Sequence, residues 1–346
     1  MAILLPIQIG LVQIISQYPS FVENYYSQGI YPFVSRFLRI AFGWIPFSVG
    51  DILLVLFLLL LFRFVYRLFK TKFKQSFQQF IKLIASLSVI YFCFYFFWGL
   101  NYYRNSLAEN LQLKQAKYTT KQLVILSNKL IAETNKIQLQ IMQSDTLQVI
   151  NPYRSKEMYQ IAIKGYNQLA TKHPQFSYKS PSIKNSLMSK LQSYNGTSGY
   201  LNPLTGEAQV NNYIPKNSIP FVVCHEIAHQ IGWAAENEAN FIGFLAAINN
   251  KNIYFKYAGY KMATRYVIYE LYKQDKELYK TIFKTINVGV KKDFKESFLF
   301  WEQHKNPFEP IIKKGYNAYL KANKQKNGIQ SYNYVVDLLI AFYHIK

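Results

Sequence analysis

The pattern His-Glu-x-x-His occupies residues 225–229 and is the part of this sequence that most directly suggests chemistry. On a helix, His225 and His229 lie one turn apart on the same face, so both imidazoles can bind one metal ion. Glu226 lies beside that face, where it can take a proton from a water molecule without binding the metal itself. This division of roles is typical of zinc hydrolases. The pattern therefore predicts Zn²⁺ as the cofactor and Glu226 as the catalytic base.

Local signals favour a helix around this motif. Ser218 is suited to the N-cap position, and Pro220 falls in the first turn, where its missing N–H costs nothing. Gly232 follows the second histidine and is a typical helix end. These signals predict a helix over residues 219–231.

A third metal ligand is expected from the next helix, predicted over residues 233–245. Glu236 and Asn240 are four residues apart and so face the same site. We expect Glu236 to bind the metal and Asn240 to form hydrogen bonds behind the ligands. Glu238 is the alternative third ligand, and the spacing leaves the choice between the two glutamates open.

The order of these motifs resembles two known groups. The Glu-x-x-Ala-Asn pattern at residues 236–240 resembles that of the gluzincin metallopeptidases, including membrane-bound ones, although Asn stands where Asp is usual. Together with Gly-Tyr-Leu-Asn-Pro-Leu-Thr-Gly-Glu-Ala at residues 199–208, the motifs look more like the bacterial domain-of-unknown-function family 3810. That resemblance extends over most of the chain. It implies a zincin-like domain with a zinc site and no particular substrate, whereas the gluzincin-like pattern favours Glu236 as the ligand.

Residues 198–213 predict a β-hairpin that turns at residues 202–206, just before the metal helix. In zincin-like enzymes a strand at this place borders the cleft. The resemblance therefore implies that Gly199, Tyr200 and Leu201 bind an extended substrate by strand addition. A purely structural hairpin is the alternative.

Two long apolar runs predict transmembrane helices at residues 52–69 and 83–100. The segment between them is basic and has no acidic residue, which places it in the cytoplasm and the following domain on the outer face of the cytoplasmic membrane. Residues 1–22 carry no charge and either span the membrane or lie at its surface, whereas residues 30–47 are typical of an interfacial amphipathic helix. Residues 1–100 are thus the predicted membrane region.

Beyond residue 100, helical periodicity dominates and predicts a mainly α-helical, zincin-like domain over residues 101–346. The helices predicted in this domain include residues 182–196, 276–303 and 331–345. Stabilising the oxyanion of a tetrahedral intermediate requires a further donor. The candidates, among which the sequence does not choose, are Tyr254, Tyr257, Tyr260, Arg265 and His304.

The composition restricts the partners. The 346 residues carry a formal net charge of +22, which suits either anionic lipid headgroups and envelope polymers or a plain solvated surface. No nucleic-acid-binding module is recognisable, so charge alone does not indicate nucleic acid. The two cysteines, Cys93 and Cys224, are not expected to form a disulfide, because one lies in an apolar run and the other beside the histidine motif.

Together these patterns predict a membrane-anchored zinc metallopeptidase that hydrolyses peptide or protein substrates outside the cell membrane. An intramembrane protease is disfavoured because acidic residues, and no long apolar span, follow the metal helix. The non-enzymatic alternative is a membrane-tethered sensor or envelope-binding protein with a structural or vestigial zinc site.

Overall fold

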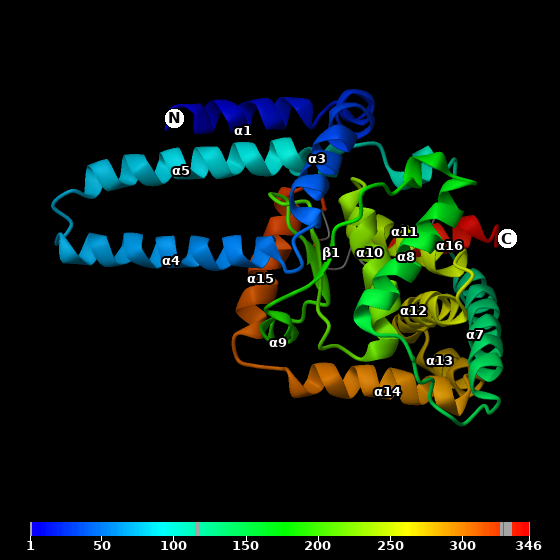
Figure 1. Cartoon of the computed structure of the whole chain (residues 1–346). Coiled ribbons are helices and arrows are strands. Elements are labelled where there is room, and N and C mark those ends of the chain that lie inside the picture. The colour runs from blue at the N-terminus through cyan, green and yellow to red at the C-terminus, as the bar shows by residue number, and fades with distance from the viewer. Residues whose placement is uncertain (1, 115–117, 326–327, 329–333, 346) are drawn as a thin grey trace.

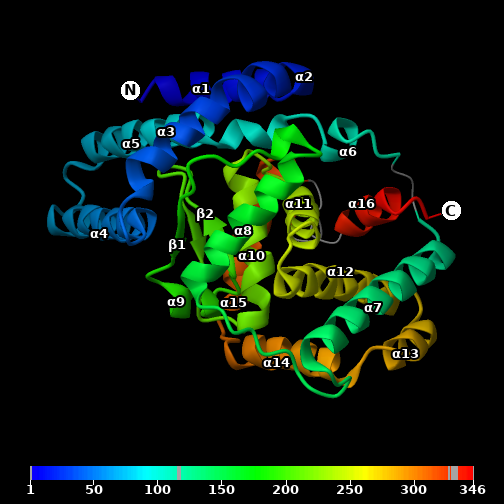
Figure 2. The ribbon, with the colours of Figure 1, turned by 45° about the vertical axis from the view of Figure 1, so that its right-hand side comes forward.

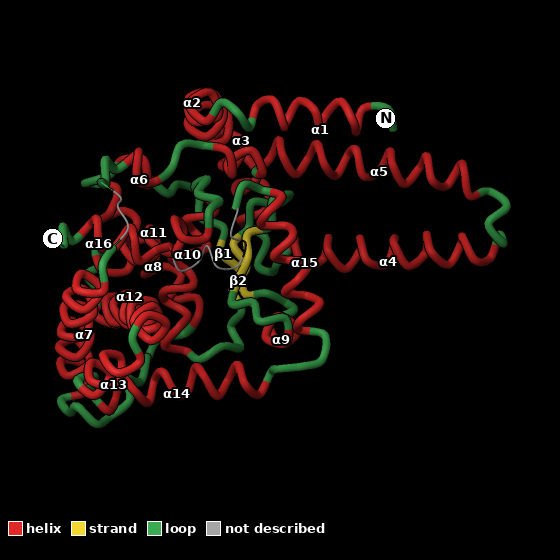
Figure 3. Tube along the Cα trace, turned by 180° about the vertical axis from the view of Figure 1, so that it is seen from behind, coloured by secondary structure: helices red, strands yellow, loops and turns green. Residues whose placement is uncertain are grey.

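Three apolar helices near the N-terminus project together from the rest of the chain (Figures 1 and 3). They are α1 (Leu4–Ile15), α4 (Val49–Lys70) and α5 (Ser76–Phe97). The computed structural model describes residues 2–114, 118–325, 328 and 334–345. With 22 residues each, α4 and α5 are about 33 Å long, enough to cross a hydrocarbon core of about 30 Å. Both predicted spans are therefore present as helices, long and apolar enough to cross a membrane.

The helix α1 runs beside α5 (Figures 1 and 3), and Ser88 Oγ donates a hydrogen bond to Gln8 at 3.1 Å. Its 12 residues extend only about 18 Å, so α1 is too short to cross a bilayer by itself. A short helix α2 (Pro19–Phe21) and a π-helix η1 (Val22–Ile30) then lead into α3 (Tyr31–Gly43).

The helix α3 corresponds to the predicted interfacial segment, and its two faces differ. Tyr31, Ser35 and Arg39 are buried against the body of the molecule. Phe33 and Trp44 lie on the opposite side and are 77% and 78% exposed. The polar face of this helix thus contacts protein, and its aromatic face points outward.

The remaining elements form a helical body with one small sheet (Figure 2). In chain order they are η2 (Gly99–Tyr103), α6 (Leu107–Asn110), α7 (Thr120–Met142), α8 (Ser155–Ala170), η3 (Pro174–Phe176), β1 (Ile183–Asn185), α9 (Ser189–Tyr194), β2 (Gly199–Leu201), β3 (Ala208–Val210), η4 (Lys216–Ser218), α10 (Ile219–Gln230), α11 (Glu236–Ile248), α12 (Ile253–Gln274), α13 (Lys276–Lys284), α14 (Val288–Gln303), α15 (Glu309–Ala322) and α16 (Val335–Phe342).

The sheet has the order β1-β3-β2. Strands β2 and β3 are antiparallel, with Tyr200 opposite Gln209, which confirms the predicted hairpin. The prediction of a helix over residues 182–196 was wrong, because Ile183–Asn185 forms β1 and pairs in parallel with β3. Only α9 is helical in that segment. The long-range pairing overrides the local helical pattern.

Two further predictions need correction or restriction. The predicted single helix over residues 276–303 is divided into α13 and α14 by a break at residues 285–287. In the predicted helix over residues 331–345, residues 331–333 lie outside the described part of the chain, and α16 accounts for most of the rest.

The helix α10 lies at the centre of the body, with α8, α11, α12 and the sheet around it (Figure 2). Almost all of its side chains are buried, so it has no solvent face. A second, smaller core joins the N-terminal segments to this body: it includes Tyr31 of α3, Trp98 after α5 and Ala234 after α10. The division of the chain at residue 100 stays a prediction, but packing crosses it.

Candidate metal centre

The helix that carries the histidines forms as the sequence predicts, over Ile219–Gln230, and Pro220 lies in its first turn. Ser218 occupies the N-cap position, but its side chain makes no capping hydrogen bond. Gly232 has a φ of +92°, a left-handed conformation that favours glycine. A Cβ there would lie 2.9 Å from the Tyr31 ring, so this turn also requires the smallest residue for packing.

Three side chains converge on one point. His225 Nε2 and His229 Nε2 are 3.1 Å apart, and Glu236 Oε2 lies 3.3 Å from the first and 3.5 Å from the second. Ligand atoms of a tetrahedral zinc with bonds of about 2.0–2.1 Å lie roughly 3.3 Å from one another. Glu236 Oε2 is buried and has no hydrogen-bond partner in the described part of the molecule. Both observations fit a cation held by these three residues.

Neighbouring groups orient the ligands. His229 Nδ1 lies 2.7 Å from the carbonyl oxygen of Trp233, which directs Nε2 toward the shared point. Tyr316 on α15 donates a hydrogen bond from its hydroxyl to Glu236 Oε1 at 2.8 Å, leaving Oε2 to face the histidines. The sequence offered no sign of Tyr316, because it lies 80 residues away in the chain.

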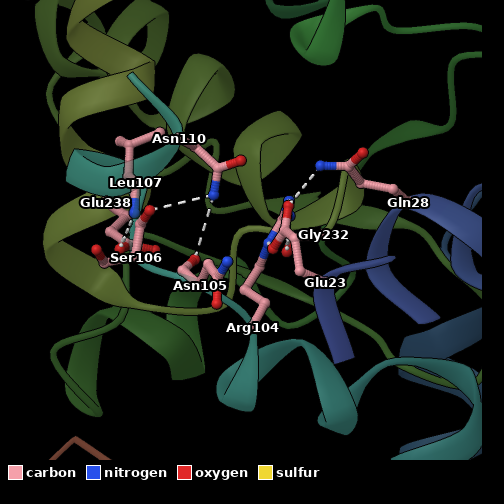
Figure 4. A network of polar contacts seen from close by, with 9 residues as sticks. All are labelled: Glu23, Gln28, Arg104, Asn105, Ser106, Leu107, Asn110, Gly232 and Glu238. Carbon is pink, nitrogen blue, oxygen red and sulfur yellow. Dashed lines mark hydrogen bonds and ion pairs between the residues drawn. The ribbon is translucent and has the colours of Figure 1, made fainter. Parts of the chain in front are cut away.

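Glu238 is oriented differently and is not part of this group. Its Oε1 accepts a hydrogen bond from the backbone N–H of Leu107 at 2.6 Å (Figure 4). Burial raises the pKa of Glu238 to about 7. The structure therefore groups Glu236 with the histidines, and Glu238 fastens the segment after η2 to α11.

Close packing of α10 and α11 brings Glu236 to the histidines. A Cβ on Gly243 would lie 3.1 Å from the backbone nitrogen of His225, so the absence of a side chain lets the helices approach. Glu236 is the first residue of α11, where the helix dipole favours a carboxylate. The loop from Ile231 to Ala235 is just long enough to reverse the chain between the two helices.

Glu226 is 2% exposed and lies on the same helix as the histidines. Its Oε2 has no hydrogen-bond partner among the described residues. Burial raises the pKa of Glu226 to about 7, although the two histidines oppose the shift. Gly199 of β2 lies against it, since a Cβ there would be 2.6 Å from Glu226 Oε1. The strand thus borders the carboxylate directly.

The ligand charges are strongly coupled. Burial disfavours a charged His229, but the adjacent Glu236 carboxylate raises the pKa of His229 to about 9. Burial likewise disfavours a charged Glu236, yet the histidines hold the pKa of Glu236 well below its usual range. A negative carboxylate thus faces two imidazoles at a point where positive charge is favoured.

Comparison with known proteins assigns the chain to a family. The family model for "Protein of unknown function (DUF3810)" matches residues 26–340. The chain belongs to the DUF3810 family. Neither the curated proteins nor the solved structures contain a match. The DUF3810 match begins before α3 and ends within α16, so it covers the α3 residues that contact α10 as well as the metal-binding group.

Side chains of α3 donate hydrogen bonds to the backbone carbonyl groups at the C-terminal end of α10 in this DUF3810 chain. Tyr31 Oη, Ser35 Oγ and Arg39 Nη1 donate to the Gln230 carbonyl oxygen at 2.9, 2.8 and 3.0 Å. Trp98 Nε1 donates to the His229 carbonyl oxygen at 3.1 Å. The last carbonyls of a helix have no partner within it, so these donors replace water in a buried place.

The loop after α10 is held by a buried ion pair (Figure 4). Arg104 Nη2 lies 2.6 Å from Oε1 of Glu23, a residue of η1, and the two side chains are 6% and 4% exposed. Arg104 also donates to the Gly232 carbonyl oxygen at 2.9 Å and lies 3.7 Å above the Trp233 ring. Because the Trp233 carbonyl orients His229, this ion pair indirectly holds one of the three candidate ligands in place.

The remaining sequence candidates have other surroundings. Asn240 is buried, and its described contacts include no hydrogen bond to a ligand. Burial raises the pKa of the nearby Tyr266 to about 12, although the charge of Arg265 opposes the shift. Tyr266 was not among the oxyanion candidates. Of those, Tyr257 donates to Asp293, and His304 Nδ1 lies 2.7 Å from the Phe300 carbonyl oxygen.

Tyr200 of β2 is held by the start of the apolar helix α4. Its hydroxyl donates to Asp51 Oδ1, at the start of α4, at 2.5 Å. The hydroxyl is therefore engaged within the protein, and the backbone of β2 remains as the part that can contact another chain. Within the described sheet, β2 is an edge strand and pairs on one side only, with β3.

Proposed function

We propose that this DUF3810 protein is a membrane-anchored zinc metallopeptidase with a zincin-like catalytic domain. The observation that carries the proposal is the convergence of His225, His229 and Glu236 within 3.1–3.5 Å of one another. Glu226 lies on the same helix as the two histidines, and its buried Oε2 has no hydrogen-bond partner among the described residues. This combination supplies a metal-binding group and a separate proton acceptor, the two parts that metal-assisted hydrolysis needs.

The metal ligands and Glu226 have separate roles in the proposed reaction. His225 Nε2, His229 Nε2 and Glu236 Oε2 would hold Zn²⁺, which when bound acts as a Lewis acid toward the scissile carbonyl. Glu226 accepts a proton from the attacking water and passes it to the leaving amine. The burial that raises the pKa of Glu226 to about 7 suits a group that must both take and give a proton near neutral pH.

The edge strand β2 is the proposed substrate-binding element. Its residues Gly199, Tyr200 and Leu201 are only partly buried, and Gly199 lies against Glu226. A peptide added as a further strand along β2 would satisfy its own backbone groups and pass beside the carboxylate. We assign Tyr200 a positioning role through Asp51, because its hydroxyl is already engaged.

The location belongs to the same proposal. Lysines and arginines lie along the end of α4 and the turn that follows it, which by the positive-inside rule places that turn in the cytoplasm. The body joins the opposite ends of α4 and α5 (Figure 1). The catalytic domain would then lie on the outer face of the cytoplasmic membrane.

A non-catalytic sensor or envelope-binding protein is the second candidate. A structural zinc site normally has four protein ligands, whereas the described residues provide a group of three. A structural site also has no use for a buried carboxylate beside the ligands. Both points favour the enzyme.

The test compares glutamate variants of the full chain in detergent. Glu226→Gln should keep its zinc and lose peptide cleavage by about 10²–10⁴-fold, since only the proton acceptor is removed. Glu236→Gln should lose zinc, and its matched control Glu238→Gln should keep it, because Glu238 is bonded to Leu107. The readouts are zinc content and cleavage of a peptide library. Undiminished cleavage by Glu226→Gln would refute the proposal.

A further inference from the structure

The apolar helix α5 ends against one of the metal ligands. Trp98 follows its last residue, donates to the His229 carbonyl oxygen at 3.1 Å, and has its ring centroid 6.0 Å from that of His229. Phe97 is the last residue of α5, so an inserted α5 leaves the hydrocarbon core near this point. The metal centre therefore lies one aromatic ring away from the residue at which α5 would leave a bilayer.

The helix behind the third ligand also rests on the end of α5. Tyr316 of α15 holds Glu236 at 2.8 Å. One turn later, Tyr319 contacts the Phe94 ring of α5, with centroids 6.2 Å apart. Tyr95 of α5 donates to Asn323, just beyond α15, at 3.0 Å. The support of Glu236 is thus fixed to the last turn of the apolar helix.

The other apolar helix begins against the proposed substrate strand. Asp51 in the first turn of α4 accepts the Tyr200 hydroxyl of β2 at 2.5 Å. The backbone N–H of Gly50 donates to Glu207, beside β3, at 2.7 Å. Both carboxylates are buried. This second attachment is independent of the first, and it fixes β2 at the level where α4 begins.

The geometry limits how far the metal centre can lie from a bilayer that holds α4 and α5. Figure 1 shows α3 at the base of the projecting helices, between them and α10. Its aromatic face points outward, and its polar face caps α10. A headgroup layer is roughly 5–8 Å thick. With α4 and α5 inserted, the metal-binding group therefore lies close to the headgroup layer.

We infer that the substrates are membrane-anchored polypeptides, cleaved in the segment that directly follows their anchor. This inference rests on the proposed peptidase function and on insertion of α4 and α5. An extended chain advances about 3.3 Å per residue, so a peptide bond within roughly ten residues of a span or lipid anchor reaches the metal-binding group while the anchor stays in the bilayer. Segments far from the bilayer must return to its surface to be cleaved.

The positions at which a tethered segment is cleaved test whether the substrates are membrane-anchored polypeptides. The full chain is reconstituted in phosphatidylcholine vesicles together with a single-span reporter whose 30 or so residues after the span are randomised. Peptides released by the wild type are sequenced by mass spectrometry. The expected cuts concentrate within about ten residues of the span. Because every position belongs to the same tethered chain, near and far positions meet the same enzyme in the same vesicle.

The position of the metal centre has a readout that needs no activity. Trp98 fluorescence is measured in vesicles whose lipids carry bromine close to the headgroups or near the chain ends, and Trp98→Phe identifies its share of the signal. Quenching should be at least twofold stronger with the shallow bromine. Trp301 of α14, which is partly buried against the main core, is the control, read with Trp301→Phe, and should be quenched by neither lipid.

The outcomes separate the two proposals. Cuts spread evenly along the reporter, or concentrated at its far end, would overturn the substrate class and leave the peptidase standing. If neither the wild type nor Glu226→Gln cleaves the reporter, the peptidase function and its substrate class are both overturned. Trp98 quenched by neither lipid would overturn the membrane position of the metal centre whatever the activity.

Discussion

At the scale of single residues, three glutamates on the adjoining helices α10 and α11 have distinct surroundings. The buried Glu226 Oε2 has no hydrogen-bond partner among the described residues, Glu236 faces the two histidines, and Glu238 accepts a hydrogen bond from a backbone N–H. Their chemistry as free amino acids is identical. The differences therefore come from packing, which sets which charge is favoured at each carboxylate.

Gly199 gives a prediction at this scale. In Gly199→Ala the new Cβ would lie 2.6 Å from Glu226 Oε1, so the carboxylate must move. A displacement of about 1 Å costs roughly 10²-fold in rate, and we expect that loss in kcat with zinc content unchanged. Gly10→Ala is the control, because nothing lies within 4 Å of its Cβ position. Normal kcat in Gly199→Ala would show that β2 does not position Glu226.

At the scale of elements, the metal helix depends on segments outside its own neighbourhood in the chain. Three donors from α3 and one from Trp98 occupy the carbonyls at its end. The pair between Glu23 and Arg104 then holds the loop that leads to α11. The ligand geometry is therefore set by contacts between elements more than by the helix itself.

The pair between Glu23 and Arg104 predicts a pH-dependent stability. Burial opposes the charge of Glu23, but Arg104 holds the pKa of Glu23 below its ordinary 4.5. A lowered native pKa stabilises the fold above the unfolded-state value and loses this contribution as the pH falls through the native one. Glu23→Gln should lower the free energy of unfolding by about 3 kcal/mol at pH 7, with the difference shrinking below about pH 4.5.

Thermal unfolding in detergent between pH 7 and pH 3 measures this difference. Glu133→Gln is the control, because its pair with Lys136 is 4.0 Å long and exposed, and we expect an effect below about 1 kcal/mol. A Glu23→Gln variant that melts with the wild type at every pH would show that the buried pair contributes nothing.

At the scale of the whole molecule, the N-terminal segments are structural parts of the body. Val22, Tyr26 and Tyr31 share a core with Trp98 and Ala234. Separating the chain at residue 100 would expose this core and leave the carbonyls at the end of α10 without donors. A buried polar group without a partner costs about 1–3 kcal/mol, and several such groups approach the total stability of a domain.

Truncation tests this dependence. The fragment of residues 101–346 should fail to bind zinc and should be digested rapidly by added protease. The longer chain of residues 18–346 lacks only the segment with α1, which packs on α5, and should keep both zinc and protease resistance in detergent. Stoichiometric zinc in a protease-resistant 101–346 fragment would establish an independent domain.

The sequence by itself determined the local features. Four-residue spacing placed the two histidines on one helical face, and two long apolar runs marked α4 and α5. The turn at Asn202 to Gly206 marked the hairpin of β2 and β3. These features depend on residues close together in the chain, so periodicity and turn chemistry are sufficient to find them.

Only the tertiary structure shows that Glu236, and not Glu238, is grouped with the two histidines. Both lie in the first turn of α11, and the choice depends on how closely α11 approaches α10 at Gly243 and on the Tyr316 hydroxyl. It also decided that residues 183–185 form a strand, since their partner β3 lies 25 positions further on. Such contacts join segments that are far apart in sequence, and their energies depend on packing that no local pattern records.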